Sequence, residues 1–303
     1  MASSYHGSNG KQRGSLVTRL CNSNTDGDAQ RFFDRNFPEL PWQSAEIYVA
    51  PVDFTSSSEL QLGSSVYVAG KHESVSAVDP SWTTSSSIHF ITDISGFQNP
   101  WQFTFDPSDL AGTGKASPIL PEPIESEFGM PQWFLSRHSS GALTDTKIAF
   151  MAYTGTPHSK LFIADVSDGS LTEVPTPYAL IQYIVGNGKG KVVGLGEPAT
   201  AGEQLFELVL DQSGKPTINV LQTKHSGSVP GPEALSTPQY HVLNLAPDNR
   251  KCYVTYYPPK NPNYDIGLAD EKPVVVLVHG GPFSMEAPVL DLSKQFWTSR
   301  GWA

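Results

Sequence analysis

The sequence is poor in cysteine. Of its 303 residues, Cys21 and Cys252 alone are cysteines. One such pair, far apart in the chain, cannot build a disulfide framework or a Cys-x-x-Cys metal site. We therefore expect two buried free thiols in a reducing compartment.

Long apolar runs and an excess of basic residues are also missing. No stretch of about 18 apolar residues occurs, and the N-terminus lacks the apolar core of a signal peptide. The 20 basic and 30 acidic residues give a net charge of -10. Such a chain has no surplus of positive charge with which to displace counterions from nucleic acid. We expect a cytoplasmic protein with neither nucleic acid nor a membrane as a partner.

Metal-binding and phosphate-binding patterns are absent as well. No two histidines have the spacing of a metal-ligand pair, so we expect no metal and no cofactor. The Gly-rich run 186–190 lacks the Gly-Lys-Ser/Thr of a phosphate loop, and a hairpin turn is the favoured interpretation. Asp265, Asp270 and Glu271 lie in a connector and are interpreted as solvated rather than catalytic.

Glycine and proline are abundant, with 26 and 25 residues. Frequent turn residues shorten every element, which excludes a helical bundle and favours many short strands. Val, Ile, Tyr and Phe recur at period two in short runs bounded by turn residues, which predicts strands in an all-β region from about 41 to 221. The predicted strands are Glu46–Ala50, Ser65–Ala69, Ser87–Thr92, Trp101–Phe105, Lys147–Ala152, Lys160–Val166 and Leu205–Leu210.

A loose internal repeat accompanies these strands. Asp79–Trp82 and Met130–Trp133 each introduce a strand pair, and their tryptophans lie 51 positions apart. A period of about 40 to 50 residues is typical of β-propeller blades, each of which must stack on its neighbours to bury its faces. A β-sandwich with similar strand spacing is the alternative. The strand region has room for about four blades or fewer.

The character of the sequence changes after residue 222. A Gly/Pro/Ser-rich stretch is followed by a hairpin-like pair, Tyr240–Leu245 and Lys251–Tyr257, and then by five consecutive branched or aliphatic residues, Val274–Val278. A continuous apolar strand is typical of a parallel sheet covered on both faces. Leu292, Phe296 and Ser299 then recur at helical spacing behind Asp291, which predicts a short amphipathic helix within 289–299.

The sharpest local motif is His279-Gly280-Gly281-Pro282, directly after the predicted buried strand. Two glycines let a backbone approach a substrate closely and direct N–H groups toward it, as the oxyanion hole of acyl transfer requires. A simple tight turn is the alternative. Gly280 and Gly281 are the oxyanion-hole candidates.

Several unusual segments in a fixed order carry a family resemblance. The runs LVHGGPFS, QFWTSRGWA and YYPPKNPNY, together with FPELPWQSAEIYVA, FITDISGFQNPW and EFGMPQW upstream, resemble the prolyl oligopeptidase family of serine peptidases, in its acylaminoacyl-peptidase and dipeptidyl-aminopeptidase branch. The similarity covers roughly residues 34 to 303. It implies a seven-bladed propeller on an α/β-hydrolase domain whose Ser-Asp-His triad hydrolyses short peptides or acyl-peptides. Of the family's site elements, only His279–Pro282 has a counterpart here.

The nucleophile motif of that family is missing. No Gly-x-Ser-x-Gly occurs in the sequence. We therefore expect a chain truncated at both ends relative to the family and inactive by itself, with a non-catalytic propeller-like interaction module or inactive remnant as the alternative. The expected organisation is a disordered polar leader (1–33), a mainly β partial propeller (34–222), a connector with a hairpin (223–273), and the first strand and helix of an incomplete α/β-hydrolase domain (274–303). Unpaired sheet edges predict self-association.

Overall fold

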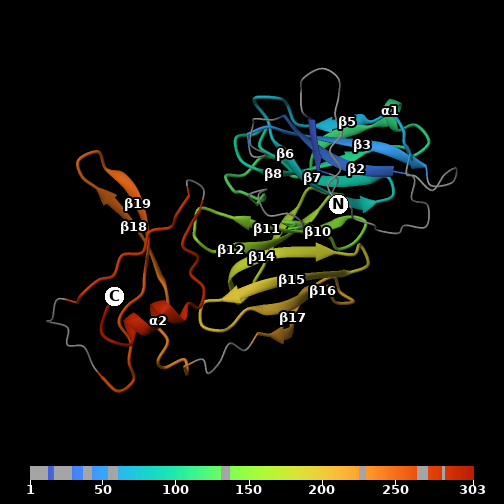
Figure 1. Cartoon of the computed structure of the whole chain (residues 1–303). Coiled ribbons are helices and arrows are strands. Elements are labelled where there is room, and N and C mark those ends of the chain that lie inside the picture. The colour runs from blue at the N-terminus through green and yellow to red at the C-terminus, as the bar shows by residue number, and fades with distance from the viewer. Residues whose placement is uncertain are drawn as a thin grey trace.

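The computed structural model describes residues 13–16, 29–36, 43–53, 61–130, 137–224, 230–264, 272–281 and 284–303. The chain is mainly β, and its strands form antiparallel sheets that follow one another along the sequence (Figure 1). Among the helices of these ranges, none is both long enough and apolar enough to cross a membrane.

The first sheet has five strands in the order β1-β2-β3-β4, with β5 also paired to β3. Its strands are β1 (Arg13–Leu16), β2 (Ala29–Asn36), β3 (Ala45–Asp53), β4 (Gln61–Leu62) and β5 (Val66–Ala69). The polar leader expected for 1–33 thus contributes backbone to this sheet at β1 and at the start of β2. The pairing of β2 with β3 extends from Ala29–Pro51 to Arg35–Ala45, and its backbone hydrogen bonds do not depend on apolar composition.

Three four-stranded sheets follow, and in each of them consecutive strands pair. The second sheet holds β6 (Ala77–Thr84), β7 (Ser87–Thr92), β8 (Asn99–Thr104) and β9 (Lys115–Pro118), with helix α1 (Leu110–Thr113) before β9. The third holds β10 (Ser140–Ala142), β11 (Lys147–Tyr153), β12 (Ser159–Asp165) and β13 (Leu171–Val174). The fourth holds β14 (Tyr178–Gly186), β15 (Lys191–Pro198), β16 (Gln204–Leu210) and β17 (Pro216–Thr223). Each strand predicted between residues 41 and 221 is confirmed, with ends shifted by at most a few residues.

The core lies between successive sheets and is shared by the third one. One apolar cluster joins the first three sheets, and a second cluster joins the third and fourth. Alternate residues of β11 point to opposite faces, so that Phe150 packs in the first cluster and Met151 in the second. Both side chains are buried.

Strands β10 and β14 approach each other closely through two glycines. A Cβ placed on Gly186 would lie 2.2 Å from the carbonyl oxygen of Ala142, and one on Gly141 would lie 2.4 Å from the backbone nitrogen of Gly186. The backbone N–H of Gly188 donates to the Ala142 carbonyl at 2.9 Å. The Gly-rich run 186–190 is therefore the predicted hairpin turn, between β14 and β15. It also joins the third sheet to the fourth, which the sequence did not predict.

Asp79 interrupts β6 and joins the second sheet to the third. The pairing of β6 with β7 has an irregularity between Val78 and Ser81, where Pro80 has no N–H to donate, and Asp79 adopts a φ of 51°. The motif Asp79–Trp82 therefore lies inside the first strand of its sheet rather than ahead of it. Of the second copy of the motif, Pro131–Trp133 lies outside the described residues.

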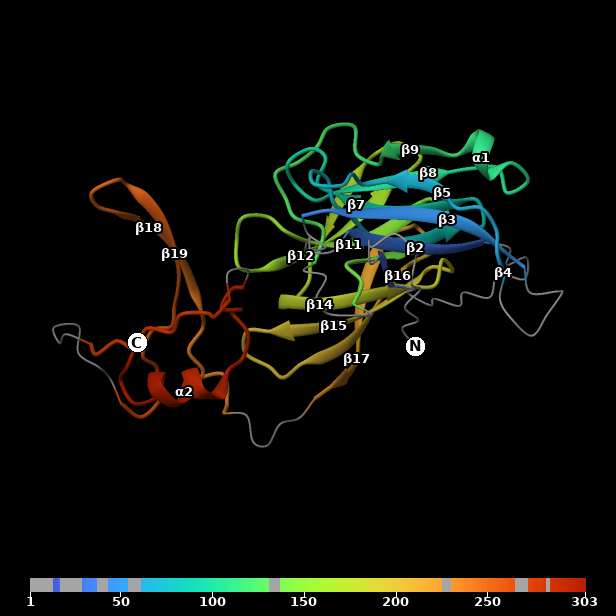
Figure 2. The same ribbon diagram turned by 45° about the horizontal axis from the view of Figure 1, so that its top comes forward.

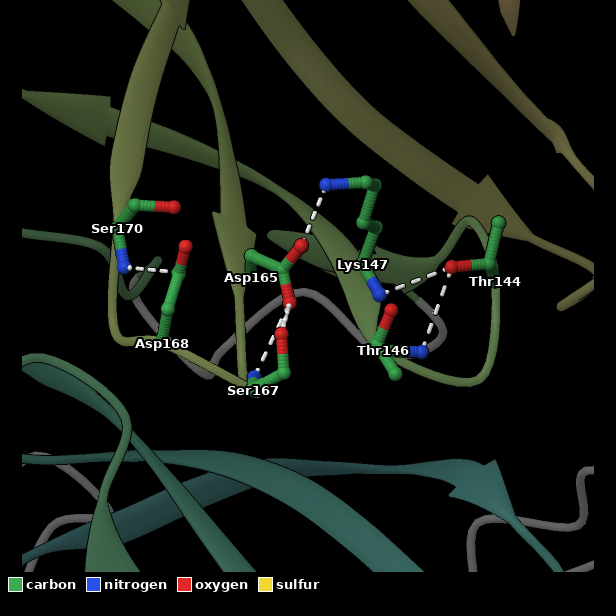
Figure 3. A network of polar contacts seen from close by, with 7 residues as sticks. All are labelled: Thr144, Thr146, Lys147, Asp165, Ser167, Asp168 and Ser170. Atoms are coloured by element: carbon green, nitrogen blue, oxygen red, sulfur yellow. Dashed lines mark hydrogen bonds and ion pairs between the residues drawn. The ribbon is translucent and has the colours of Figure 1, made fainter. Parts of the chain in front are cut away.

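A polar network closes the end of the third sheet (Figure 3). The Asp165 carboxylate accepts hydrogen bonds from Lys147 Nζ at 2.5 Å and from both Oγ and N–H of Ser167. Partial burial disfavours ionisation of Asp165, but these donors outweigh it and lower its pKa to about 2. In the neighbouring turn, Ser170 donates its N–H to Asp168 at 2.9 Å.

The C-terminal part lies to one side of the four sheets in both views (Figures 1 and 2). It contains the predicted hairpin, as β18 (Gln239–Leu245) and β19 (Arg250–Tyr256), and the predicted helix, as α2 (Leu292–Thr298). The prediction of a buried strand at 274–278 is wrong, since Val276 is 77% exposed and Val278 82% exposed. The segment forms no strand, because no described strand pairs with it or covers it.

Candidate functional site

A cleft of about 800 Å³ lies in the C-terminal part. Its walls are formed by β19, residues 274–279, residues 284–286 and α2. The turn 155–157 of the third sheet closes one side. Valines and tyrosines are the most frequent residues of the lining. Clefts of this size and composition are typical of ligand-binding sites.

The predicted motif lies at the rim of this cleft. His279 lines the cleft and is exposed, and Gly280 and Gly281 follow it. Gly281 has a φ of 68°, in the left-handed region that favours glycine, and a Cβ placed on either glycine would meet no atom within 4 Å. The backbone here is therefore open to an incoming group. Pro282 lies outside the described residues.

Lys294 and Glu286 line the same cleft as His279, and Asp291 lies near Lys294. Lys294 Nζ is 3.0 Å from Glu286 Oε2 and 4.0 Å from Asp291 Oδ2, and it lies 5.3 Å from the centre of the Tyr257 ring. Burial, reinforced by the two carboxylates, raises the pKa of Tyr257 to about 12. Tyr257 therefore stays protonated at neutral pH and cannot serve there as a base.

Helix α2 is anchored through polar groups rather than through the predicted apolar face. Asp291 caps its N-terminus, and Gln295 and Thr298 are its buried residues. Gln295 Oε1 accepts from the Ser236 N–H at 2.7 Å, while Gln295 Nε2 donates to the Ser236 carbonyl at 3.0 Å. Phe296, predicted to face a core, is 48% exposed. The amphipathic prediction for this helix is wrong about which face is buried.

An aspartate–histidine pair that the sequence did not reveal lies among the sheets. His138 Nδ1 is 2.5 Å from Asp79 Oδ1, and Asp79 Oδ2 accepts from both N–H and Oγ of Ser139. The serine hydroxyl donates to the carboxylate and not to the imidazole, so the arrangement differs from a Ser-His-Asp triad, in which the serine contacts the histidine. Its residues lie 59 positions apart, and the only sequence signal was an Asp-Pro pair within a strand.

The remaining candidate groups are a cysteine of the cleft and several residues outside the described ranges. Cys252 is a free thiol that lines the cleft and is half-buried rather than buried as predicted, and Cys21 lies outside the described residues, as do Asp265, Asp270 and Glu271. Within the ranges that the structure describes, no group of three or more His, Cys, Asp or Glu side chains could hold a metal ion.

Several solved structures similar to this chain are peptidases. No family model and no curated protein matches the sequence. A puromycin-hydrolysing peptidase of Mycobacterium tuberculosis matches 91% of this chain with 25% identity and a TM-score of 0.75. A puromycin hydrolase matches the same share with 24% identity and a TM-score of 0.74. A prolyl endopeptidase structure matches 96% of the chain with 12% identity and a TM-score of 0.60, which concerns the fold alone.

These likenesses confirm the resemblance of the sequence to the prolyl oligopeptidase family of peptidases. Among the structures described above, the puromycin-hydrolysing peptidases have the higher TM-scores. The chain spans 40% of the length of the first of these and 39% of the second.

Proposed function

We propose that these 303 residues form later blades of a β-propeller and the start of an α/β-hydrolase domain in a serine peptidase. The observation that carries this proposal is the open Gly280–Gly281 backbone at the rim of a cleft, in a chain whose fold is that of known peptidases. Each of the four successive antiparallel sheets corresponds in this proposal to one blade.

In the proposed reaction, the substrate carbonyl lies over the loop 279–281. The backbone N–H near Gly281 donates to the oxyanion that forms when a serine attacks this carbonyl. Opposite charge develops on the histidine that takes the serine proton, and the aspartate of the triad stabilises it. The Gly-x-Ser-x-Gly of the nucleophile is not in this sequence, so the 303 residues supply the oxyanion contact and not the nucleophile.

The proposed substrates are short peptides or acyl-peptides. The structural neighbours are named for the hydrolysis of puromycin, and puromycin is therefore the probe substrate. Within the cleft, apolar walls beside the loop would contact an apolar side chain of the substrate.

The first test reads the coding sequence in frame beyond Ala303. Codons for Gly-x-Ser-x-Gly, followed by an aspartate and a histidine, are the expected result, and the encoded longer polypeptide should hydrolyse puromycin. In that polypeptide, Gly281→Ala strains the left-handed residue and should lower kcat by about tenfold or more. Gly214→Ala is the matched control, because Gly214 has a φ of 81°, equally open surroundings and a remote position. Equal effects of the two changes would argue against an oxyanion role.

The second candidate is a propeller-like interaction module without hydrolase chemistry. It is favoured by the missing nucleophile motif. A stop codon directly after Ala303, with noncoding sequence beyond it, would support this candidate and overturn the first. Under both proposals the purified 303-residue chain should not react with a fluorophosphonate serine probe, and stoichiometric labelling would contradict both.

A further inference from the structure

The turn between β14 and β15 carries an asparagine–glycine pair. The sequence has two such pairs, Asn9–Gly10 and Asn187–Gly188, and the first lies outside the described residues. Asparagine is thermally labile, because the backbone nitrogen of the next residue can attack the carbon of its carboxamide. Glycine in the next position makes this attack easiest, since it has no side chain to hinder the nitrogen. Asn187 is exposed, so water can reach it, and the pair therefore has the chemistry of a deamidation site.

Both reacting groups are held by hydrogen bonds in the folded chain. The Gly188 N–H donates to the Ala142 carbonyl at 2.9 Å, and the Lys189 N–H donates to Asn187 Oδ1 at 2.8 Å. To react, the Gly188 nitrogen must lose its proton, and the Asn187 carboxamide must be free to bring its carbon to that nitrogen. The folded turn therefore opposes the reaction, and an opened turn permits it.

The turn is held by the neighbouring sheet as well as by its own bonds. Besides the bond from Gly188 to Ala142, the Gly190 N–H donates to the Leu143 carbonyl at 2.5 Å. These two bonds, here called the sheet joint, connect the turn of the fourth sheet to the end of β10 in the third. Ala142 and Leu143 are both buried. The protection of Asn187 therefore depends on whether the third and fourth sheets stay together.

We propose that Asn187 is a site of spontaneous deamidation whose rate is set by the opening of the sheet joint. In the open turn, the Gly188 nitrogen forms a bond to Cγ of Asn187. The C–N bond of the carboxamide breaks, and ammonia leaves with the proton that the Gly188 nitrogen gives up. The resulting succinimide ring is opened by water at either of its carbonyls, which leaves aspartate or isoaspartate. Water is the one co-reactant of the sequence.

The isoaspartate product cannot rebuild the sheet joint. Its main chain passes through the former side chain and is longer by one methylene carbon. The Gly188 and Gly190 N–H groups then no longer match the carbonyls of Ala142 and Leu143 together, and a buried carbonyl that loses its donor is costly. A transient separation of two sheets is in this way converted into a permanent one. The inference does not rest on the proposed peptidase activity, since its test has no catalytic readout.

Peptide mapping of the full 303-residue chain by mass spectrometry, during incubation at mildly alkaline pH, tests the proposal. Enzymatic methylation detects the isoaspartate. Asn187 should react about tenfold or more slowly than in the free peptide 185–192, because the joint is closed most of the time. Gly141→Ala should bring the rate toward that of the peptide, since a Cβ there overlaps the Gly186 backbone nitrogen and forces the two strands apart. Equal rates in the wild type and the free peptide, or an unchanged rate in Gly141→Ala, would overturn the proposal.

Gly70→Ala is the matched control. A Cβ on Gly70 overlaps the Ala45 carbonyl oxygen, so the change strains the first sheet and not the joint. The deamidation rate of this variant should stay near that of the wild type. An acceleration as large as that of Gly141→Ala would show that global unfolding sets the rate, and the proposal would fail.

A second measurement uses the wild type alone and does not depend on a variant folding. Over a series of low urea concentrations, the deamidation rate should rise in parallel with hydrogen exchange at Gly188. It should rise less steeply than exchange at the buried Met151, whose N–H donates to the Ser139 carbonyl, because joint opening exposes less surface than global unfolding. A deamidation rate that follows Met151 instead would contradict the proposal.

The isolated isoaspartyl protein tests the effect on the joint. It should melt at a lower temperature than the variant Asn187→Asp, which carries the same charge on a main chain of normal length. Equal melting temperatures would show that the longer turn still makes the joint, against the proposed permanence.

Discussion

Asp79 carries a buried carboxylate at the junction of two sheets. It is 5% exposed and accepts hydrogen bonds from Ser139 N–H at 2.8 Å and from Ser139 Oγ at 2.9 Å, besides its contact with His138. Such a group stabilises the fold only while all its donors are in place, because an unpaired buried polar group is costly.

The change Asp79→Asn should lower the free energy of unfolding by about 3 kcal/mol, since it removes the charge that these donors satisfy. Asparagine also tolerates a positive φ, so the backbone at 51° is not the cause of the loss. Urea denaturation measures the change. Asp168→Asn is the control, because Asp168 is exposed and asparagine can also accept the hydrogen bond from the Ser170 N–H. A loss of unfolding free energy as large as that of Asp79→Asn would refute the argument.

Asp165 should make stability depend on pH in the acid range. Its pKa is about 2 in the folded chain against an ordinary 3.8, so its contribution is fully present above the ordinary value and is lost as the pH falls through about 2. The shift corresponds to about 2 kcal/mol. Urea denaturation at a series of pH values should show the wild type losing that much more than Asp165→Asn on acidification. Parallel curves for the two proteins would contradict the prediction.

At the scale of the element, α2 illustrates how a local pattern and its packing can diverge. The spacing of Leu292, Phe296 and Ser299 located the helix, and Asp291 located its start. The buried face was not predictable, because it is chosen by the backbone groups of Ser236, which lie 59 positions away and pair with Gln295.

The change Gln295→Met should loosen this helix. It keeps the volume of the side chain but leaves the N–H and carbonyl of Ser236 without partners, at a cost of about 2 kcal/mol. Hydrogen exchange at Ser299, whose N–H donates to the Gln295 carbonyl at 3.0 Å, should accelerate about thirtyfold. The same replacement at the exposed Gln212 should leave this rate unchanged, and an unaltered rate in the Gln295 variant would rule out the anchor.

The strands were more predictable than the helix face. Ser87–Thr92 was located to the residue, because its apolar side chains both define the strand pattern and fill the core. In 274–278 the same chemistry predicted burial wrongly, because a strand is buried only where neighbours cover it and no described strand does so. The left-handed backbone of Gly281 is one that its glycine permits, and the oxyanion role stays a prediction. The Asp79–His138 pair depends on how two sheets stack and left almost no local signal.

At the scale of the whole molecule, the described residues of the four sheets and of the C-terminal part share no apolar core. All members of both core clusters precede residue 219. The hydrogen bonds that link the parts include Tyr240 Oη to the Gly155 carbonyl and Leu290 N–H to the Pro198 carbonyl, each at the long distance of 3.3 Å. Sparse polar contacts of this kind leave the two parts able to open independently.

Limited digestion of the full chain with trypsin should therefore separate the two parts. Among the bonds C-terminal to residue 43, the first to be cut should be the one after Lys224, whose side chain is 71% exposed at the end of the fourth sheet. The fragment that carries the sheets should keep its β circular dichroism and a cooperative melt. Lys224→Gln should remove this product, and early cuts within the sheets would show that the parts are not separable.

Strand β11 contributes side chains to both apolar clusters, and this has a consequence for its register during folding. In the native register Phe150 faces Phe162 and Met151 faces Leu161, and the two residues of β11 fill different clusters. A slip of one residue would turn every side chain of the strand to the opposite face. Both clusters would then lose their native packing at once. A third sheet in the wrong register is therefore destabilised against the second and the fourth sheet together, which favours the native alignment of all three.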